Sequence, residues 1–462
     1  TQDILAWHSA MTDVFTDFRD FQEAREHLAS MKKIAESDVW TLLSEVALLH
    51  AEDRNEDALL LSGVALSEYP SSRPLLQQKA NLLEELGRPD EAIALLRQAL
   101  PKAESCWIVA QLAQLLNSLE RFQEALTEYE RFKSLQLLPD KGVEQWLNAG
   151  LFRCHYRTGN SERALEHVGK NPAPSQLKLL ENLKNAEPQH RREELALDYV
   201  RQHHSTCGPA TVTTIARYWE KEVDHLELAN EICYDGTSHN ALRDWAEKNG
   251  WSAREFTLDW ETTKSLIKRR LPIALTTVET DSAHLQAVCG YDEALGLILL
   301  RDPSSIAIRE GLAEKFFERY TFCGPRAMLL IPQEESHRLD LELPDAELFD
   351  LLYQLEQELE AENRARAEQT AAIIRSKAPD HRLNHYAQWA LALYDENLYG
   401  QLEALKALRR LFPDSDSLTY QEFMVLTQLG LQLKARELLE ERCAKPGATI
   451  FEPHLAATLL TD

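Results

Sequence analysis

The residues with the clearest chemical use surround Cys207, near the end of the stretch Gln202 to Ala210. Cys207 stands directly before Gly-Pro-Ala and a helical run from Thr211 to Glu220, so we expect its thiol at a helix N-terminus. Proline suits the first turn of a helix, where no N–H partner is needed. The unpaired N–H groups and the dipole of that terminus stabilise an anion. The sequence therefore predicts a Cys207 thiolate, a nucleophile that needs a base.

The expected base is His284, and its expected partner is Asp302. Two apolar, strand-like runs, His284–Tyr291 and Leu295–Arg301, lie on either side of Glu293. A hairpin that turned around Glu293 would set His284 opposite Asp302. Cross-strand neighbours have Cβ atoms about 4.5 to 5.5 Å apart, which lets a carboxylate reach an imidazole N–H. Asp302 would then fix the tautomer and orientation of the ring.

Together these residues suit nucleophilic attack on a peptide bond. Cys207 would attack the carbonyl carbon, while His284 would take the thiol proton and later protonate the leaving amine. Gln202, five residues before the nucleophile, would donate a hydrogen bond to the oxyanion, with the Cys207 backbone N–H as second donor. His203 or His204 could hold the base role instead, although a residue so close in sequence would have to fold back over the helix end.

Length and composition limit the architecture and the partners. A chain of 462 residues is long enough for about three domains. The net charge of −25 argues against nucleic acid or an anionic membrane as the main partner, because both attract basic surfaces. No apolar run approaches the roughly 20 residues of a membrane span, and the N-terminus has no signal-peptide pattern. We therefore expect a protein or peptide partner.

The cysteines predict a reducing, cytoplasmic location and no metal or cofactor. They are scattered and odd in number, which does not suit a disulfide framework. The sequence has no Cys-x-x-Cys pair, so zinc has no support. Cys323-Gly324-Pro325 repeats the tripeptide that begins at Cys207, but Glu318 stands where an amide would be needed, so we expect Cys323 to have a packing role. The cysteines stand at positions 106, 154, 207, 233, 289, 323 and 443.

Residues 1–170 form a repeat of helix pairs. Small residues recur in matching contexts, and a second small residue precedes most of them by about 12 positions, as at Ala113 and Ala149. A period near 34 residues is typical of tetratricopeptide repeats, whose stacked helix pairs form a concave surface that holds a peptide or protein segment. Residues 171–194 are the expected linker after this arm. The recurring residues are Ala24, Ala58, Ala92, Ala125 and Ala164.

Residues 195–332 change in character, since helical runs are followed by apolar, β-branched runs. This order predicts an α+β domain with an antiparallel sheet. The expected strands are Leu197–Gln202, 251–258, Pro272–Val278, His284–Tyr291, Leu295–Arg301 and Ala327–Pro332, and the expected helices are Thr211–Glu220, Leu226–Cys233, Asn240–Asn249 and Thr262–Arg270.

The residues around Cys207, His284 and Asp302 resemble a known family, the papain-like peptidases that process bacteriocins after double-glycine leaders. The resemblance covers about 135 residues and rests on their order and spacing. It implies that Cys207 is the nucleophile, His284 the base, Asp302 its orienting partner and Gln202 the oxyanion donor. Most relatives are fused to an exporter with membrane helices. We expect no membrane helix in this sequence, so the resemblance does not imply peptide export. The motifs are 199–202, Cys207-Gly208-Pro209-Ala210, Gly236-Thr237-Ser238, His284 in SAHLQAVCGYD and Arg301-Asp302-Pro303.

A charged linker at 333–345 precedes a second helical arm at 346–462, whose last repeat is expected to be incomplete. The sequence thus predicts a papain-like cysteine peptidase domain of α+β class between two tetratricopeptide-like arms. It would hydrolyse a peptide bond in a protein or peptide substrate, and the arms would hold that substrate or an adaptor. Three alternatives stay open: an idle scaffold, an acyltransferase with the same triad, and an enzyme that its arms inhibit.

Overall fold

The computed structural model describes most of the chain and divides it into two compact units. One unit combines Thr1–Pro188 with Arg201–His204 and Arg301–Arg309, and the other combines Gln189–Val200, Ser205–Leu300 and Glu310–Asp462. The described residues are 2–102, 105–136, 138–168, 174–187, 190–234, 236–280, 282–445, 451–452 and 454–455.

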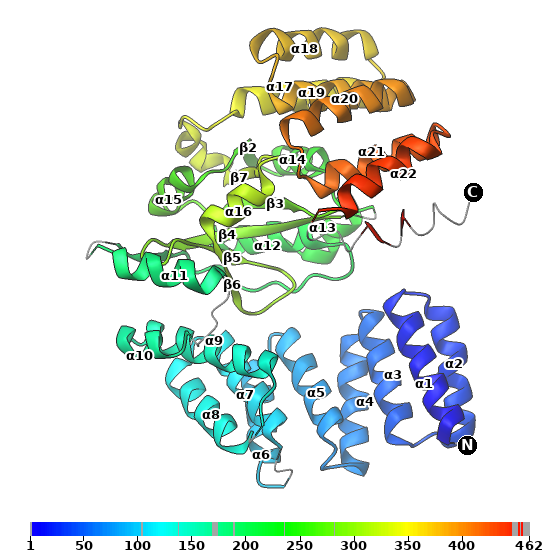
Figure 1. Cartoon of the computed structure of the whole chain (residues 1–462), viewed down its shortest axis with the longest axis vertical. Coiled ribbons are helices and arrows are strands. Elements are labelled where there is room, and N and C mark those ends of the chain that lie inside the picture. Colours follow the sequence, from blue (N-terminus) through cyan, green and yellow to red (C-terminus); the bar gives the residue numbers. More distant parts are fainter. Residues whose placement is uncertain are drawn as a thin grey trace. The chain divides into compact units, whose positions relative to one another are not determined.

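The N-terminal part of the first unit consists of consecutive helices that pack as pairs (Figure 1). A short helix, α11 (Pro174–Asn185), follows them within the expected linker. The pairs are α1 (Gln2–Asp17) with α2 (Phe21–Ala35), α3 (Val39–Ala51) with α4 (Asn55–Glu68), α5 (Arg73–Glu85) with α6 (Pro89–Ala99), α7 (Cys106–Ser118) with α8 (Phe122–Leu135), and α9 (Lys141–Arg157) with α10 (Ser161–Glu166).

The recurring small residues lie where the helices meet. All five have no exposed surface, so a larger side chain at any of these positions would push two helices apart. This burial confirms the repeat that the sequence predicts. The residues are Ala24, Ala58, Ala92, Ala125 and Ala164.

The last full pair departs from the expected pattern by one residue. Ala149 is exposed, and the close approach occurs at Gly150, which is buried. A Cβ atom added to Gly150 would lie 2.4 Å from Cζ of Tyr129 on α8. The expected role of Ala149 as a packing residue is therefore wrong, because the ring of Tyr129 faces the next position along α9.

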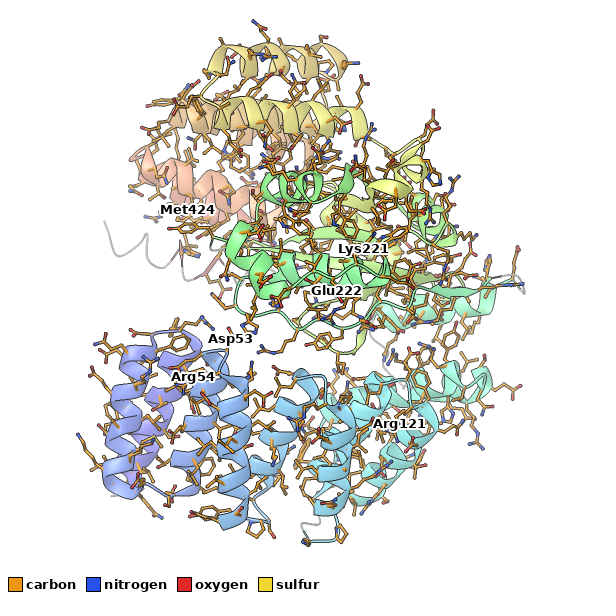
Figure 2. All side chains as sticks on the ribbon, turned by 180° about the vertical axis from the view of Figure 1, so that it is seen from behind. Asp53, Arg54, Arg121, Lys221, Glu222 and Met424 are labelled. Carbon is orange, nitrogen blue, oxygen red and sulfur yellow. The ribbon has the colours of Figure 1, made fainter. Side chains whose placement is uncertain are left out.

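Ion pairs on the surface connect neighbouring repeats. Arg121, labelled in Figure 2, reaches Asp90 of the preceding pair at 3.1 Å and Glu124 on its own helix at 2.7 Å. Its hydrogen bonds, together with one from Arg97, lower the pKa of Glu124 to about 2. Exposed pairs of this kind contribute little to stability, so the repeat depends mainly on its buried alanines and leucines.

The second unit is built around a seven-stranded sheet in the order β2-β7-β3-β4-β5-β6, with β1 paired to β4. Strand β3 pairs antiparallel with β4 from Ile273↔Val288 to Val278↔Ala283, which sets Thr277 opposite His284. The strands are β1 (Arg192–Glu194), β2 (Trp251–Thr257), β3 (Ile273–Val278), β4 (Ala283–Asp292), β5 (Leu297–Arg301), β6 (Ile308–Leu312) and β7 (Arg326–Pro332).

Helices pack against this sheet and join it to the second arm. Helix α12 contacts β4 and β3, whereas α14 and α17 contact β2. All the expected helices of the central domain are present within two residues of their predicted starts, except that α12 starts at the nucleophile itself. The helices are α12 (Cys207–Tyr218), α13 (His225–Ile232), α14 (His239–Lys248), α15 (Trp260–Lys268) and α16 (Ala313–Tyr320).

Two strands differ from the sequence prediction. Residues Leu197–Gln202 form no strand, and the N-terminal strand is β1, which pairs with the end of β4. The chain leaves the sheet after Leu195, whose N–H still donates to Cys289 O. Strand β6 was not predicted, because its sequence IREGL lacks a run of β-branched residues. The expected class, an α+β domain between helical arms, is confirmed, while its boundaries stay predictions.

In the described part of the second arm, three further helix pairs follow a 3-10 helix, η1 (Gln333–Leu339). Leu402 on α20 and Ala435 on α22 lie 33 positions apart, at matching places in two successive pairs, and both are buried. The expected incomplete last repeat lies largely outside the described residues. No helix in the described part of the chain is both long enough and apolar enough to cross a membrane. The pairs are α17 (Ala346–Glu360) with α18 (Arg364–Lys377), α19 (Arg382–Tyr394) with α20 (Leu398–Leu411), and α21 (Asp416–Gln428) with α22 (Gln432–Cys443).

The contact between Gly150 and Tyr129 gives a test of the first arm. We expect Gly150→Val to destabilise the arm by about 1 to 3 kcal/mol, because the added methyl groups overpack the helix contact. The matched control is Ala149→Val, which adds a similar side chain at the exposed neighbouring position. Thermal loss of helical circular dichroism should begin earlier for Gly150→Val alone, and equal melting curves would contradict the contact.

Candidate active site

Cys207 is the first residue of α12, as the sequence predicts. The chain enters the helix through Ser205, which has a left-handed backbone with φ 57°, an uncommon conformation for a residue other than glycine. Thr206 Oγ1 hydrogen-bonds His225 Nε2 at 2.8 Å, and Cys233 Sγ donates to Ser205 O at 3.1 Å. Helix α13 and the residue after it therefore fix the turn that presents the thiol.

His284 hydrogen-bonds the Cys207 thiol. Burial by itself would raise the pKa of Cys207, but the hydrogen bond and the charge of His284 act in the opposite direction. Hydrogen bonds with the backbone of Leu285 and Gly208 also favour the thiolate, and the pKa of Cys207 ends below its ordinary value. The predicted nucleophile and the predicted base are thus in contact, with the thiol shifted toward its reactive form.

Two threonines hold the strand that carries His284. Thr211, one turn after the thiol on α12, is fully buried and donates from Oγ1 to Leu285 O at 3.0 Å. Thr277 Oγ1 on β3 donates to His284 O at 3.3 Å. The backbone around His284 is therefore fixed from the helix on one side and from the neighbouring strand on the other. The general spacing rules of helices and strands do not reveal this role for either threonine.

The glycine after Cys207 makes room for a turn from a distant part of the chain. A Cβ atom on Gly208 would lie 3.0 Å from Cβ of Thr237. The next residue of that turn, Ser238, caps α14 by accepting a hydrogen bond from Ala241 N at 3.1 Å. The motif Gly236-Thr237-Ser238 thus packs against the start of the nucleophile helix, while Asp235 lies outside the described residues.

Asp302 follows β5 directly and is fully buried. Its Oδ1 accepts hydrogen bonds from the backbone N–H of Ser304 at 2.8 Å and from the hydroxyl of Ser304 at 2.7 Å, while Arg309 pairs with its Oδ2. Strands β4 and β5 are neighbours in the sheet. The turn between them spans 293–296, so it is centred later than the predicted turn around Glu293. The role of Asp302 as orienting partner stays a prediction.

Gln202 lies beside the segment that carries Asp302, because its backbone N–H donates to Pro303 O at 3.0 Å. Its side-chain Oε1 is buried and has no hydrogen-bond partner among the described residues. The oxyanion role of Gln202 also stays a prediction.

Other cysteines differ from Cys207 in their chemistry. Burial raises the pKa of Cys323 and that of Cys154 to about 12, so neither thiol ionises near neutral pH. The Sγ of Cys323 donates a hydrogen bond to Tyr320 O at 3.2 Å, which agrees with the packing role expected for this residue. All seven cysteines are free, and no group of three or more histidine, cysteine or acidic residues that could hold a metal occurs in the described ranges.

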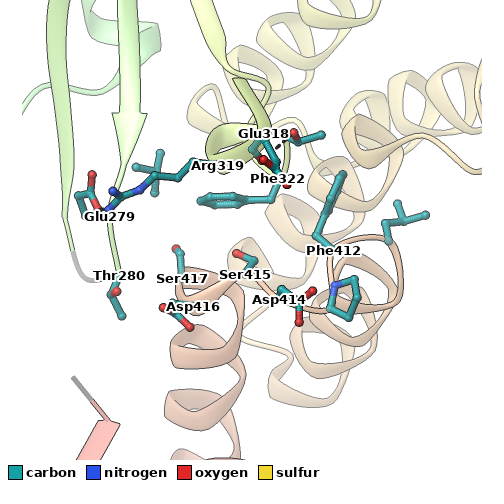
Figure 3. A pocket seen from close by; sticks show the side chains of 14 residues that line it. Glu279, Thr280, Glu318, Arg319, Phe322, Phe412, Asp414, Ser415, Asp416 and Ser417 are labelled. Carbon is teal, nitrogen blue, oxygen red and sulfur yellow. Dashed lines mark hydrogen bonds and ion pairs between the residues drawn. The ribbon is translucent and has the colours of Figure 1, made fainter. Parts of the chain in front are cut away.

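A cavity of about 450 Å³ lies at the far end of the β3–β4 hairpin (Figure 3). Its walls are the hairpin residues Glu279 and Thr280, the end of α16, and the turn from Leu411 to Ser417 between α20 and α21. Arg319 and Glu279, which both line the cavity, form an ion pair. The second arm therefore contributes directly to a hollow next to the hairpin that carries His284.

Comparison with known proteins supports the assignment of the central domain. Residues 194–328 match the family model described as Peptidase_C39 like family. This match confirms the resemblance that the motifs around Cys207 and His284 indicate, and it gives those residues a papain-like peptidase fold. No curated protein matches the chain.

Solved structures resemble separate parts of the chain. The peptidase domain of Streptococcus ComA, a bi-functional ABC transporter, is 18% identical and matches 31% of this chain and 100% of its own, with a TM-score of 0.26. MamA is 15% identical and matches 36% of this chain and 90% of its own, with a TM-score of 0.29. A tetratricopeptide repeat protein from Parabacteroides merdae is 16% identical and matches 39% of this chain and 85% of its own, with a TM-score of 0.27.

The lowered pKa of Cys207 predicts how its alkylation depends on pH. Because the thiolate is the reactive form, Cys207 should react with iodoacetamide along a curve whose midpoint lies below the ordinary thiol value of about 8.5. His284→Ala should move this midpoint upward and slow the reaction at pH 7 about tenfold or more, since one pKa unit changes the thiolate fraction tenfold. Site-resolved mass spectrometry measures both.

Cys443 serves as the internal control, because burial raises its pKa. Its labelling should need higher pH than that of Cys207 and should not respond to His284→Ala. Equal labelling curves for the two cysteines would contradict an activated thiol at Cys207.

The hydrogen bond from Thr211 gives a test of how the site is held together. Thr211→Val leaves the Leu285 carbonyl without this donor and puts a methyl group in its place, so we expect a loss of about 1 to 3 kcal/mol in stability and slower alkylation of Cys207. Thr213→Val is the matched control, since the buried Thr213 hydroxyl has no partner among the described residues. Thermal unfolding and the alkylation rate should separate the two variants, and identical behaviour would refute the role of Thr211.

Proposed function

We propose that this chain is a cysteine endopeptidase. The observation that carries the proposal is the hydrogen bond between His284 and Cys207 at the N-terminus of α12, with the thiol pKa lowered. The match of residues 194–328 to a peptidase family model supports the same conclusion. The seven free thiols agree with a cytoplasmic location, which is part of the proposal.

In the proposed reaction the Cys207 thiolate attacks the carbonyl carbon of a peptide bond. A carbon–sulfur bond forms, and the electron pair of the carbonyl moves to its oxygen. The protonated His284 gives its proton to the leaving nitrogen as the carbon–nitrogen bond breaks, which leaves a thioester. Water then attacks the thioester while His284 takes the water proton, and the acid product departs from the restored thiolate.

Asp302 and Gln202 complete the proposed site. Asp302 follows the strand next to the one that carries His284, and its burial would strengthen a hydrogen bond to the imidazole. Gln202 would turn its amide N–H toward the oxyanion, beside the backbone N–H groups at the start of α12. The backbone contact between Gln202 and Pro303 is consistent with both side chains serving one centre.

The helical arms are proposed to recruit a protein or peptide substrate or an adaptor. Stacked helix pairs commonly present a concave surface to an extended segment. Binding energy gained there would position the scissile bond beside Cys207. The cavity at the end of the β3–β4 hairpin offers room for part of that segment next to the strand of His284 (Figure 3).

Three alternatives to the proposal predict different outcomes. An amine in place of water would make the enzyme an acyltransferase, and added hydroxylamine would then be incorporated into the product in preference to hydrolysis. A catalytically idle scaffold would release no peptides at all. Inhibition by the arms predicts that a partner protein, or removal of the arms, accelerates cleavage.

The decisive test compares peptides released from a cell lysate by the full chain and by its variants. Cys207→Ala and His284→Ala should release none above background, whereas Cys106→Ala, which replaces a half-buried thiol on α7, should behave as the unaltered chain. Gln202→Ala should slow release about 10² to 10³-fold, as expected for one lost oxyanion donor. Equal peptide sets from the unaltered chain and Cys207→Ala would overturn the peptidase.

A further inference from the structure

A second cavity, of about 350 Å³, lies where the sheet meets the second arm. Its walls come from β3, β7 and α14 on one side and from α17, α19 and α21 on the other. The volume is within the range of small-molecule sites, which usually combine apolar walls with a few polar groups. Its apolar wall includes Phe322, Phe349, Leu352, Leu383, Leu393 and Leu418.

Two hydrogen-bond donors on this wall lack an acceptor. Nη2 of Arg326 on β7 and Nε1 of Trp389 on α19 are both buried, and neither has a partner among the described residues. A buried donor without an acceptor costs about 1 to 3 kcal/mol, so two of them on residues that line one cavity indicate that something else accepts from them.

The charges around the cavity are already balanced. Arg326 Nε forms an ion pair with the fully buried Glu255 at 2.5 Å. Burial raises the pKa of Glu356 and lowers that of His239 well below its ordinary value, which favours the uncharged form of both. His239 Nε2 is also in contact with Thr276 Oγ1 at 2.7 Å. A charged ligand would therefore be buried without a free counter-ion, which is costly.

We propose that this cavity binds an uncharged amphipathic small molecule, whose carbonyl oxygen accepts from Arg326 Nη2 or Trp389 Nε1 and whose apolar body packs against the leucines. The inference does not rest on the proposed peptidase activity.

Thr276 and Val278 line the cavity, and they alternate with Thr277, whose paired residue is His284. Because side chains alternate along a strand, the cavity and His284 lie on opposite faces of the sheet.

Octanamide is a suitable probe, because it joins an amide carbonyl to an apolar chain. We expect calorimetry with the full chain to show saturable binding of octanamide at one site. Octanoate and octylamine, which carry a charge at neutral pH, should bind at least about tenfold more weakly because that charge must be desolvated.

Three variants locate the binding. Trp389→Phe keeps the ring but removes the N–H, so affinity should fall about 3- to 10-fold, as for one neutral hydrogen bond. Ala390→Leu should weaken binding further, because Ala390 lines the cavity and the larger side chain fills part of it. Trp7→Phe, at an exposed position on α1, should leave affinity unchanged.

Two outcomes would overturn the proposal. One is that none of the three probes binds saturably, particularly if Ala390→Leu raises the melting temperature, which would indicate a void that holds water only. The other is binding that Trp389→Phe and Ala390→Leu leave unchanged, which would place the probe elsewhere. Circular dichroism confirms that each variant is folded, and peptide release by the unaltered chain is measured separately.

Discussion

The contact between Cys207 and His284 depends on how one helix is seated against one strand. The thiol and the imidazole come from α12 and β4, and the Thr211 hydroxyl joins these two elements one turn from the thiol. Gly208 lets the turn at Thr237 approach the same helix end. The chemistry of the cysteine is therefore set by packing as much as by its nearest partner, since burial opposes ionisation and the hydrogen bonds reverse that effect.

Strand β3 serves both faces of the sheet. Thr277 holds the backbone of His284, while Thr276 and Val278 face the second arm. The second arm therefore packs against the sheet, because α17 and α19 lie over the face opposite to the one that carries His284. Arg326 belongs to the face that meets the second arm, since it pairs with Glu255 and its guanidinium group lies over the ring of Phe349 on α17.

Much of this arrangement is predictable from sequence, because periodicity and local chemistry decide it. The repeating alanines are predictable from their period, and the helix start at Cys207 from Gly-Pro-Ala. Cross-strand register and short strands are harder to predict from sequence, because they depend on partners distant in the chain. Strand β6 has no apolar run, and β1 is a strand only because it pairs with Gly290 to Asp292 of β4. The roles of Thr211 and Gly150 depend on a single neighbour, Leu285 or Tyr129, which no local pattern specifies.

Strand β1 has a practical consequence for anyone who trims this protein. Arg192–Glu194 lie before residue 195, where composition alone would start the domain, and they cover the end of β4 from Gly290 to Asp292. A fragment that begins at residue 195 would expose that ladder as a bare edge, a known template for intermolecular pairing. Insolubility of such a fragment would then reflect a missing strand and would carry no information about catalysis.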